Sequence, residues 1–138
     1  MVKLYCILAR ASATAVIFRR GPAKQIRLIR WDLGRHTFDC GQWFKGQIYV
    51  RKSDLSPDGS KLVYFAAKFR APLRTWIAIS TPPYFTAHVL WEGVGTWNDI
   101  SLFDDNTTLA LATYRADSSL VPYEGFLTPR RLRVRAKP

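Results

Sequence analysis

The sequence predicts an all-β protein whose chain forms about three antiparallel units of four strands each. Three observations lead to this prediction. The apolar pattern repeats with a period of 47 residues, the repeats alternate strand-like runs with proline and glycine turns, and no stretch keeps a helical period. Aromatic residues make up 14% of the chain, and such rings pack well on the pleated surface of a sheet.

The repeat aligns residues 5–46 with residues 52–93 without a gap. The shift of 47 places Leu8 on Leu55, Val16 on Val63, Phe18 on Phe65, Phe38 on Phe85 and Gly46 on Gly93. It also carries Leu62 to Leu109, so a third copy begins near Trp97. We therefore expect a single domain over residues 1–138, with repeats at about 5–46, 52–93 and 97–138, the end of the third being the least defined.

In the first copy, the apolar run at residues 4–9 is expected to form a strand. The run stops at Arg10 after six residues, which is shorter than the roughly 7–15 apolar residues of a signal peptide. A second strand is expected at residues 15–18, where four apolar residues lie over residues 62–65 of the next copy.

In the second copy, strands are expected at residues 52–55, 62–67, 75–80 and 85–91. Residues 56–59, with the sequence SPDG, separate the first two as a turn, because proline presets the first central dihedral angle and glycine takes the last place at little cost. Leu55 and Leu62 flank this turn and are expected in the core. Pro82 and Pro83 end the third strand because proline has no amide hydrogen to donate.

In the third copy, residues 104–106 are expected to form a turn before a strand at residues 107–114. The shift then places residues 119–126 and 131–135 at the third and fourth strands. Apolar residues alternate with arginine in the last segment, which favours an edge strand with one solvated face. A frayed basic tail is an equally supported alternative.

Four-stranded units repeated at this spacing are typical of β-propeller blades. Residues 54–62, DLSPDGSKL, resemble the hairpin that joins two strands of a blade in WD-repeat proteins and related propellers. Trp31 and Asp32 supply the Trp-Asp pair once, and the alignment puts it in the third strand, where that family has it. Residues 5 to about 114 are also similar to uncharacterised bacterial propeller-like proteins that continue with more repeats. The resemblance implies propeller-type blades and no particular activity.

Three units are too few for a closed ring, since propellers have about 4–8 blades. We expect the outward flanks of the first and third units to carry large apolar residues that a neighbouring blade would cover. Three explanations stay open: a head-to-tail homodimer, completion of the ring by a partner, or a fragment or degenerate relative of a larger propeller.

The net charge of +11 is uneven, with +9 in residues 1–53, −2 in residues 54–114 and +4 in residues 115–138. Such a field raises association rates with polyanions and acidic proteins without choosing among them. A basic hairpin tip, the cations that follow it and two nearby tryptophans form a candidate surface for nucleic acid or another partner. Its members are Arg19, Arg20, Lys24, Arg27, Arg30, Arg35, Trp31 and Trp43. A solvated loop is the alternative.

No pattern predicts a catalytic residue, a metal or a cofactor. Cys6 and Cys40 are expected to be reduced and buried in a cytoplasmic protein, Cys40 because its repeat equivalent is Ala87. His36, Cys40 and His88 lack the spacing of a zinc site, and His88 is expected to be packed on its strand. No glycine pattern for a nucleophile elbow or a phosphate loop is present.

Two further expectations concern acids and membranes. The aspartates at positions 54, 58, 104 and 105 are expected to cap the backbone of turns rather than to act as a catalytic pair. No run approaches the roughly 18 apolar residues of a membrane span, so no membrane partner is expected.

The function that these observations favour is a non-enzymatic scaffold that binds another protein, with an acidic partner favoured by the charge. Nucleic-acid binding through the basic N-terminal hairpin is the alternative from a different class. Glycan binding on Trp76, Trp91 and Trp97 is a third hypothesis, carried only by the analogy of small lectins built from blades.

Overall fold

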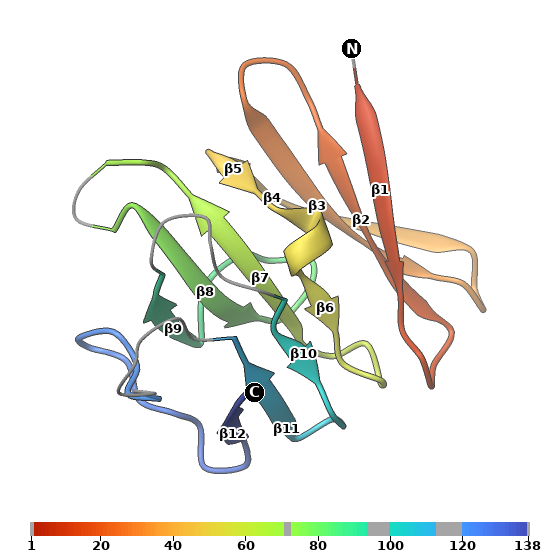
Figure 1. The fold of residues 1–138 in the computed structure, drawn as a ribbon. Coiled ribbons are helices and arrows are strands. Elements are labelled where there is room, and N and C mark those ends of the chain that lie inside the picture. The colour runs from red at the N-terminus through yellow and green to blue at the C-terminus, as the bar shows by residue number, and fades with distance from the viewer. Residues whose placement is uncertain (1, 71–72, 94–99, 113–119, 138) are drawn as a thin grey trace.

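The computed structural model describes residues 2–70, 73–93, 100–112 and 120–137. In these ranges the protein is all-β apart from one short 3-10 turn at Val50–Lys52. The strands form three sheets that follow one another along the chain (Figure 1). None of the described residues belongs to a helix long and apolar enough to cross a membrane.

The first sheet contains four consecutive antiparallel strands, in the order β1 (Lys3–Leu8), β2 (Thr14–Arg20), β3 (Gln25–Asp32) and β4 (Thr37–Lys45). The strands expected at residues 4–9 and 15–18 are therefore confirmed as β1 and the middle of β2. The register between β3 and β4 shifts between Arg27 and Ile29, which marks a β-bulge.

The second sheet contains five strands: β5 (Gln47–Ile48), β6 (Asp54–Leu55), β7 (Leu62–Ala67), β8 (Thr75–Ser80) and β9 (Val89–Glu92). The predictions for β7 and β8 are confirmed to the residue. Two others are corrected: residues 50–52 form a 3-10 turn, and β9 begins at Val89 rather than at residue 85. Strand β5, which pairs with β7, has no signal in the repeat.

The turn between β6 and β7 has the predicted form. The Gly59 amide donates to the Ser56 carbonyl oxygen at 2.8 Å, and Gly59 has a φ of 78°. The Asp58 carboxylate accepts hydrogen bonds from the Ser56 hydroxyl at 2.8 Å and the Ser60 amide at 2.9 Å. Leu55 and Leu62 are buried, as expected for the residues on either side of this turn.

The third sheet departs from the prediction. It contains β10 (Leu102–Phe103), β11 (Thr108–Leu111) and β12 (Arg133–Ala136), and β12 runs parallel to β11. The expectation that residues 131–135 form a fourth strand is therefore wrong, because β12 takes the place beside β11 that a third strand would fill. The end of the strand predicted at residues 107–114 lies outside the described residues.

The segment expected as the third strand of that unit lies against the second sheet instead. The Tyr123 amide donates to the Leu90 carbonyl oxygen at 2.7 Å, and the Trp91 indole donates to the Leu120 carbonyl oxygen at 3.0 Å. These bonds hold the segment at the edge of β9. The described strands thus form three sheets of four, five and three strands, which are not three equal units, and all their pairs are antiparallel except β11 with β12.

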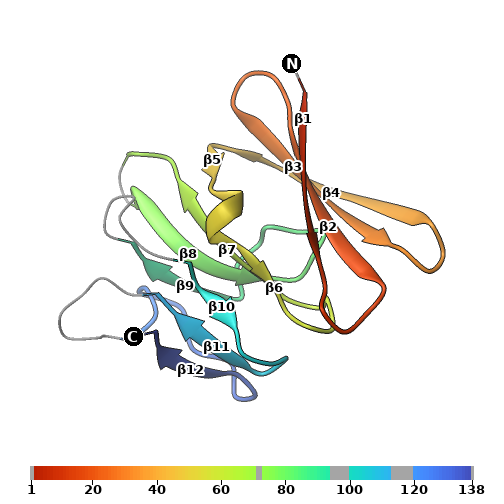
Figure 2. The same ribbon diagram turned by 45° about the vertical axis from the view of Figure 1, so that its right-hand side comes forward.

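The sheets stack in a row, with the second sheet between the other two (Figure 2). Every residue of β7 and β8 is buried. Val16 and Phe18 of the first sheet share a core with Leu62 and Tyr64 of the second. The opposite face of the second sheet forms another core with the third sheet. Across the described ranges the row does not close into a ring.

The Gly59 turn belongs to the second sheet and contacts the first, and this contact gives a test of how the two sheets pack. A Cβ atom at Gly59 would lie 2.8 Å from Cβ of Thr14 in the first sheet, whereas one at Gly125, with a φ of 92°, would meet nothing within 4 Å. Both alanine substitutions strain the backbone. We expect Gly59→Ala to cost about 1–3 kcal/mol more than Gly125→Ala in chemical unfolding, because it also forces the sheets apart. Equal costs would contradict the contact between the sheets.

Candidate functional site

The side of the first sheet that faces away from the second sheet is the most distinctive surface of the protein. Cross-strand pairing arranges its side chains in three rows. We call these twelve residues the outer face: Leu4, Arg19, Arg27 and Trp43; Cys6, Ile17, Ile29 and Cys40; Leu8, Ala15, Trp31 and Phe38.

Large apolar side chains of the outer face are in solvent. The exposed fractions are 65% for Leu4, 61% for Leu8, 56% for Phe38 and 45% for Trp43. The rings of Trp31 and Phe38 are stacked, with centroids 5.5 Å apart. Soluble monomers rarely expose a contiguous apolar patch without a binding role, so the outer face is the first candidate for a functional surface.

The cysteines correct the sequence prediction. Cys6 and Cys40 are free thiols, as expected, but both are exposed rather than buried. They lie in the middle row of the outer face, at the two ends of that row. Cys40 does not share the partial burial of its repeat equivalent Ala87, because no described part of the chain covers this side of the first sheet. Partial desolvation raises the pKa of the Cys6 thiol.

The charge on the outer face has one sign. Arg19 and Arg27 are its two charged residues, and both belong to the row that begins at Leu4. Arg27 donates from Nε to the Gly41 carbonyl oxygen at 3.0 Å, and its guanidinium lies 5.5 Å from the centre of the Trp43 ring. The outer face is therefore apolar over most of its extent and positive along one side.

The structure divides the basic surface that the sequence predicted. Arg20 lies on the opposite side of β2 from Arg19, donating to the Ile48 carbonyl oxygen at 3.1 Å and stacking over the Tyr5 ring. Arg30 forms an exposed ion pair of 2.5 Å with Asp39.

The remaining members of the predicted surface also separate. Lys24 is in the turn between β2 and β3, whereas Arg35 is in the turn between β3 and β4, at the other end of these strands. The structure thus brings Arg19 and Arg27 together with Trp31 and Trp43 on the outer face, and it places Arg20, Lys24, Arg30 and Arg35 elsewhere.

A second basic surface lies between the first and second sheets. Arg20, Lys24 and Lys68 line a groove of about 360 Å³, and no acidic residue lines it. Phe69, which is half exposed, forms part of its wall. The contribution of Lys68 could not be predicted from the sequence, because this lysine comes from the second repeat and no local pattern connects it with the tip of the first.

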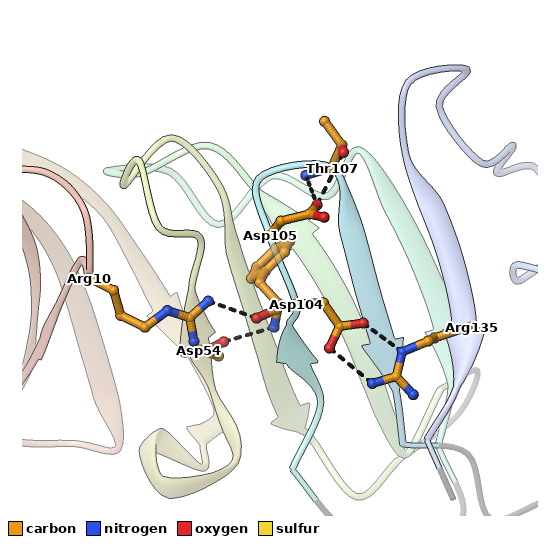
Figure 3. Close-up of polar contacts among 7 residues, drawn as sticks. Arg10, Asp54, Asp104, Asp105, Thr107 and Arg135 are labelled. Atoms are coloured by element: carbon orange, nitrogen blue, oxygen red, sulfur yellow. Dashed lines mark hydrogen bonds and ion pairs between the residues drawn. The ribbon is translucent and has the colours of Figure 1, made fainter.

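Polar contacts connect the turns and inner strands of all three sheets (Figure 3). Arg10, just after β1, donates to the Phe103 carbonyl oxygen at 2.7 Å, and the Phe103 amide donates to the Asp54 carboxylate at 2.8 Å. Burial raises the pKa of Asp54, against the opposing effects of the Phe103 amide and Arg10. Asp54 therefore joins strands β6 and β10. The prediction that it caps a turn is wrong.

The acids of the third sheet are also engaged by neighbours. Asp105 accepts hydrogen bonds from the Thr107 amide and hydroxyl, as Asp58 does from Ser60 one repeat earlier. Asp104 instead forms an ion pair with Arg135 on β12. Within the described ranges, no group of three or more His, Cys, Asp or Glu residues could hold a metal ion.

Four aromatic residues bear on the remaining hypotheses. His88 is exposed and forms a 2.6 Å hydrogen bond with the Thr81 hydroxyl, so the expectation of a packed histidine is wrong. Partial desolvation of its ring lowers the pKa of His88, and the positive charge of Lys61 adds to this effect. Trp76 and Trp91 are buried in the cores, so a sugar could not stack on them without opening the sheets. Trp97 lies outside the described residues.

Comparison of the chain with protein-family models, with curated proteins and with solved structures finds no match. The surfaces described above therefore carry the functional argument.

The ion pair between Asp104 and Arg135 gives a prediction about acid. The hydrogen bond with Arg135 lowers the pKa of the Asp104 carboxyl below its ordinary value of about 4. A lowered pKa in the folded state stabilises the protein above that ordinary value, and this contribution is lost as pH falls through the lowered pKa. We expect the difference in melting temperature between the parent and Asp104→Asn to be present at neutral pH and to vanish in acid. Arg135→Gln should behave in the same way, and a difference that persists in acid would contradict the assignment.

Proposed function

We propose that this protein is a non-enzymatic interaction scaffold built from propeller-type blades, and that it binds another protein through the outer face. The exposure of this face carries the proposal. Its three rows present leucine, isoleucine, phenylalanine and tryptophan to solvent over four adjacent strands, and interfaces between proteins are enriched in aromatic residues and arginine at their centres.

The blade interpretation is supported by the way the sheets pack. Val16 and Phe18 of the first sheet face the second sheet. Their repeat equivalents, Val63 and Phe65, face the third sheet. Corresponding residues therefore make corresponding contacts in two successive interfaces, as expected when each sheet is one unit of a repeating array.

The composition of the outer face favours a protein over a polyanion. Ten of its residues are uncharged and two are arginines. A phosphate backbone would leave most of this apolar surface wet, whereas an apolar protein surface would cover it. The two arginines favour a partner with carboxylates opposite the row that begins at Leu4.

This proposal predicts a specific loss of binding. Leu8→Asp with Phe38→Asp should remove binding partners that the parent chain retains in quantitative co-purification, because both side chains are large, apolar and exposed on the proposed interface. Leu127→Asp, at a side chain that is 85% exposed in a surface loop, is the control and should retain them. A partner that is lost with the double variant and retained with the control must also bind the purified chain. If every partner binds the double variant as well as the parent, the outer face is not the binding surface.

Nucleic-acid binding is the second candidate, and the basic groove between the sheets supports it. Arg20, Lys24 and Lys68 line this groove without an acid. Phe69 offers a half-exposed ring on which a base could stack. Arg20 is also bound to the Ile48 carbonyl oxygen, so replacing it would disturb the fold as well as the charge.

A salt titration tests this candidate. Lys24→Ser with Lys68→Ser, which removes two cations that line the groove, should weaken binding to mixed RNA and DNA. It should also reduce the slope of log K against log salt concentration by up to about 2, since each phosphate contact contributes roughly 0.9. Arg130→Ser with Arg131→Ser removes the same charge from the third-sheet side and is the control. Equal weakening by the two variants would indicate a general effect of net charge and exclude a site in the groove.

A further inference from the structure

We propose that the occupant of the outer face is another antiparallel β-sheet of the same repeat type, supplied by a polypeptide other than a second copy of this chain. This inference rests on the proposed function and names the partner's class. It follows from where the covered and uncovered faces fall in the repeat.

The outer face has an exact counterpart that is covered in this protein. The shift of 47 residues carries Leu8 to Leu55, Phe38 to Phe85 and Trp43 to Leu90. All three residues of the second repeat belong to the core between the first and second sheets. At the second sheet, therefore, the positions that are exposed on the first sheet are covered by the preceding sheet.

The same relation holds once more along the chain. Leu109 and Leu111 of the third sheet are the repeat equivalents of Leu62 and Tyr64, and they pack in the core formed with the second sheet. Each time the face appears with a preceding sheet, that sheet covers it with a valine and a phenylalanine two residues apart on one strand. The first sheet has no preceding sheet in the described structure, and its face is in solvent.

A second copy of the chain does not supply the required cover. Head-to-tail packing would present the far side of its third sheet, where the equivalents of Val63 and Phe65 are Ala110 and Ala112. Both alanines are already buried. In the described strands of this sheet, the far side holds one large apolar residue, Leu102, beside the arginines of β12. The expectation of large apolar residues on both flanks is thus confirmed for the first sheet and wrong for the third.

Contact between two outer faces is also disfavoured. Such a dimer would bring Arg19 and Arg27 of both copies into one interface with no acidic residue on either face. Like charges that lose solvent without a partner are costly. A sheet from a different chain can present apolar residues toward the lower two rows and carboxylates toward the arginines.

The experiment supplies a preceding sheet and measures whether the outer face accepts it. A second copy of residues 48–94 placed directly before residue 1 keeps the 47-residue spacing and adds no cysteine. The probe is the rate at which Cys6 and Cys40, both on the outer face, react with an aromatic disulfide reagent. We expect both thiols to react readily in the parent and about tenfold or more slowly in the monomeric fusion, since reaction then requires the added sheet to open.

Two matched fusion proteins keep the test decisive. Val63→Ser with Phe65→Ser in the added copy alone should restore the parent rate, because these residues would make the contact. A second fusion, with residues 1–47 duplicated and both cysteines of the duplicate changed to serine, presents Val16 and Phe18 instead and should also protect the thiols. Sedimentation at the same concentration establishes the mass of each species.

The outcomes separate the inference from the function on which it rests. Unprotected thiols in both fusions would overturn the proposal of a docked sheet. If partner binding still depended on Leu8 and Phe38, the proposed function as an interaction scaffold would remain supported. Thiols already protected in a dimeric parent would overturn the docked-sheet proposal in favour of a second copy. Protection in either monomeric fusion supports it.

Discussion

Strands β7 and β8 are buried along their whole length, and the architecture depends on this burial of one sheet between two others. An ordinary antiparallel sheet keeps one face in water, but here Val63 and Phe65 face the third sheet while Leu62 and Tyr64 face the first. The sheets are held in order at their inner strands as well, since Arg10 of the first sheet reaches Phe103 of the third across β6. Packing therefore propagates in one direction along the chain.

This directional packing explains why the functional surface lies at one end of the row. A stack of identical units leaves one face of each kind exposed at its two ends. At the far end, small residues and the ion pair between Asp104 and Arg135 occupy the exposed side, and β12 closes the sheet early. At the near end, Leu8, Trp31 and Phe38 are large apolar residues, of the kind that a covering sheet would bury. The two ends are chemically unlike, and only the first resembles an unfinished interface.

The sequence predicted well those features that depend on position within the repeat. Strands β7 and β8 and the turn at Gly59 follow from local patterns that agree with the 47-residue period. The direction of β12 could not be predicted, because alternating residues indicate an edge strand without specifying its neighbour. The prediction that Cys40 is buried was wrong for a related reason. Alignment with Ala87 places Cys40 on one face of its sheet, but burial depends on whether another sheet covers that face. The prediction of a single basic surface was wrong because Arg19 and Arg20, which are adjacent in sequence, point to opposite sides of β2.

The sizes of the side chains on the outer face determine which sheet could pack against it. Ala15 stands where the second sheet has Leu62, and Trp31 stands where it has Ala78. Small and large residues have therefore exchanged places between two faces that occupy the same position in the repeat. Cores are packed closely enough for such exchanges to matter. A sheet that fits the second unit would meet a projection at Trp31, and it would not reach Ala15, whose side chain is fully buried. The repeat geometry thus favours docking of a sheet in general, while Trp31 favours a sheet with a small side chain opposite it.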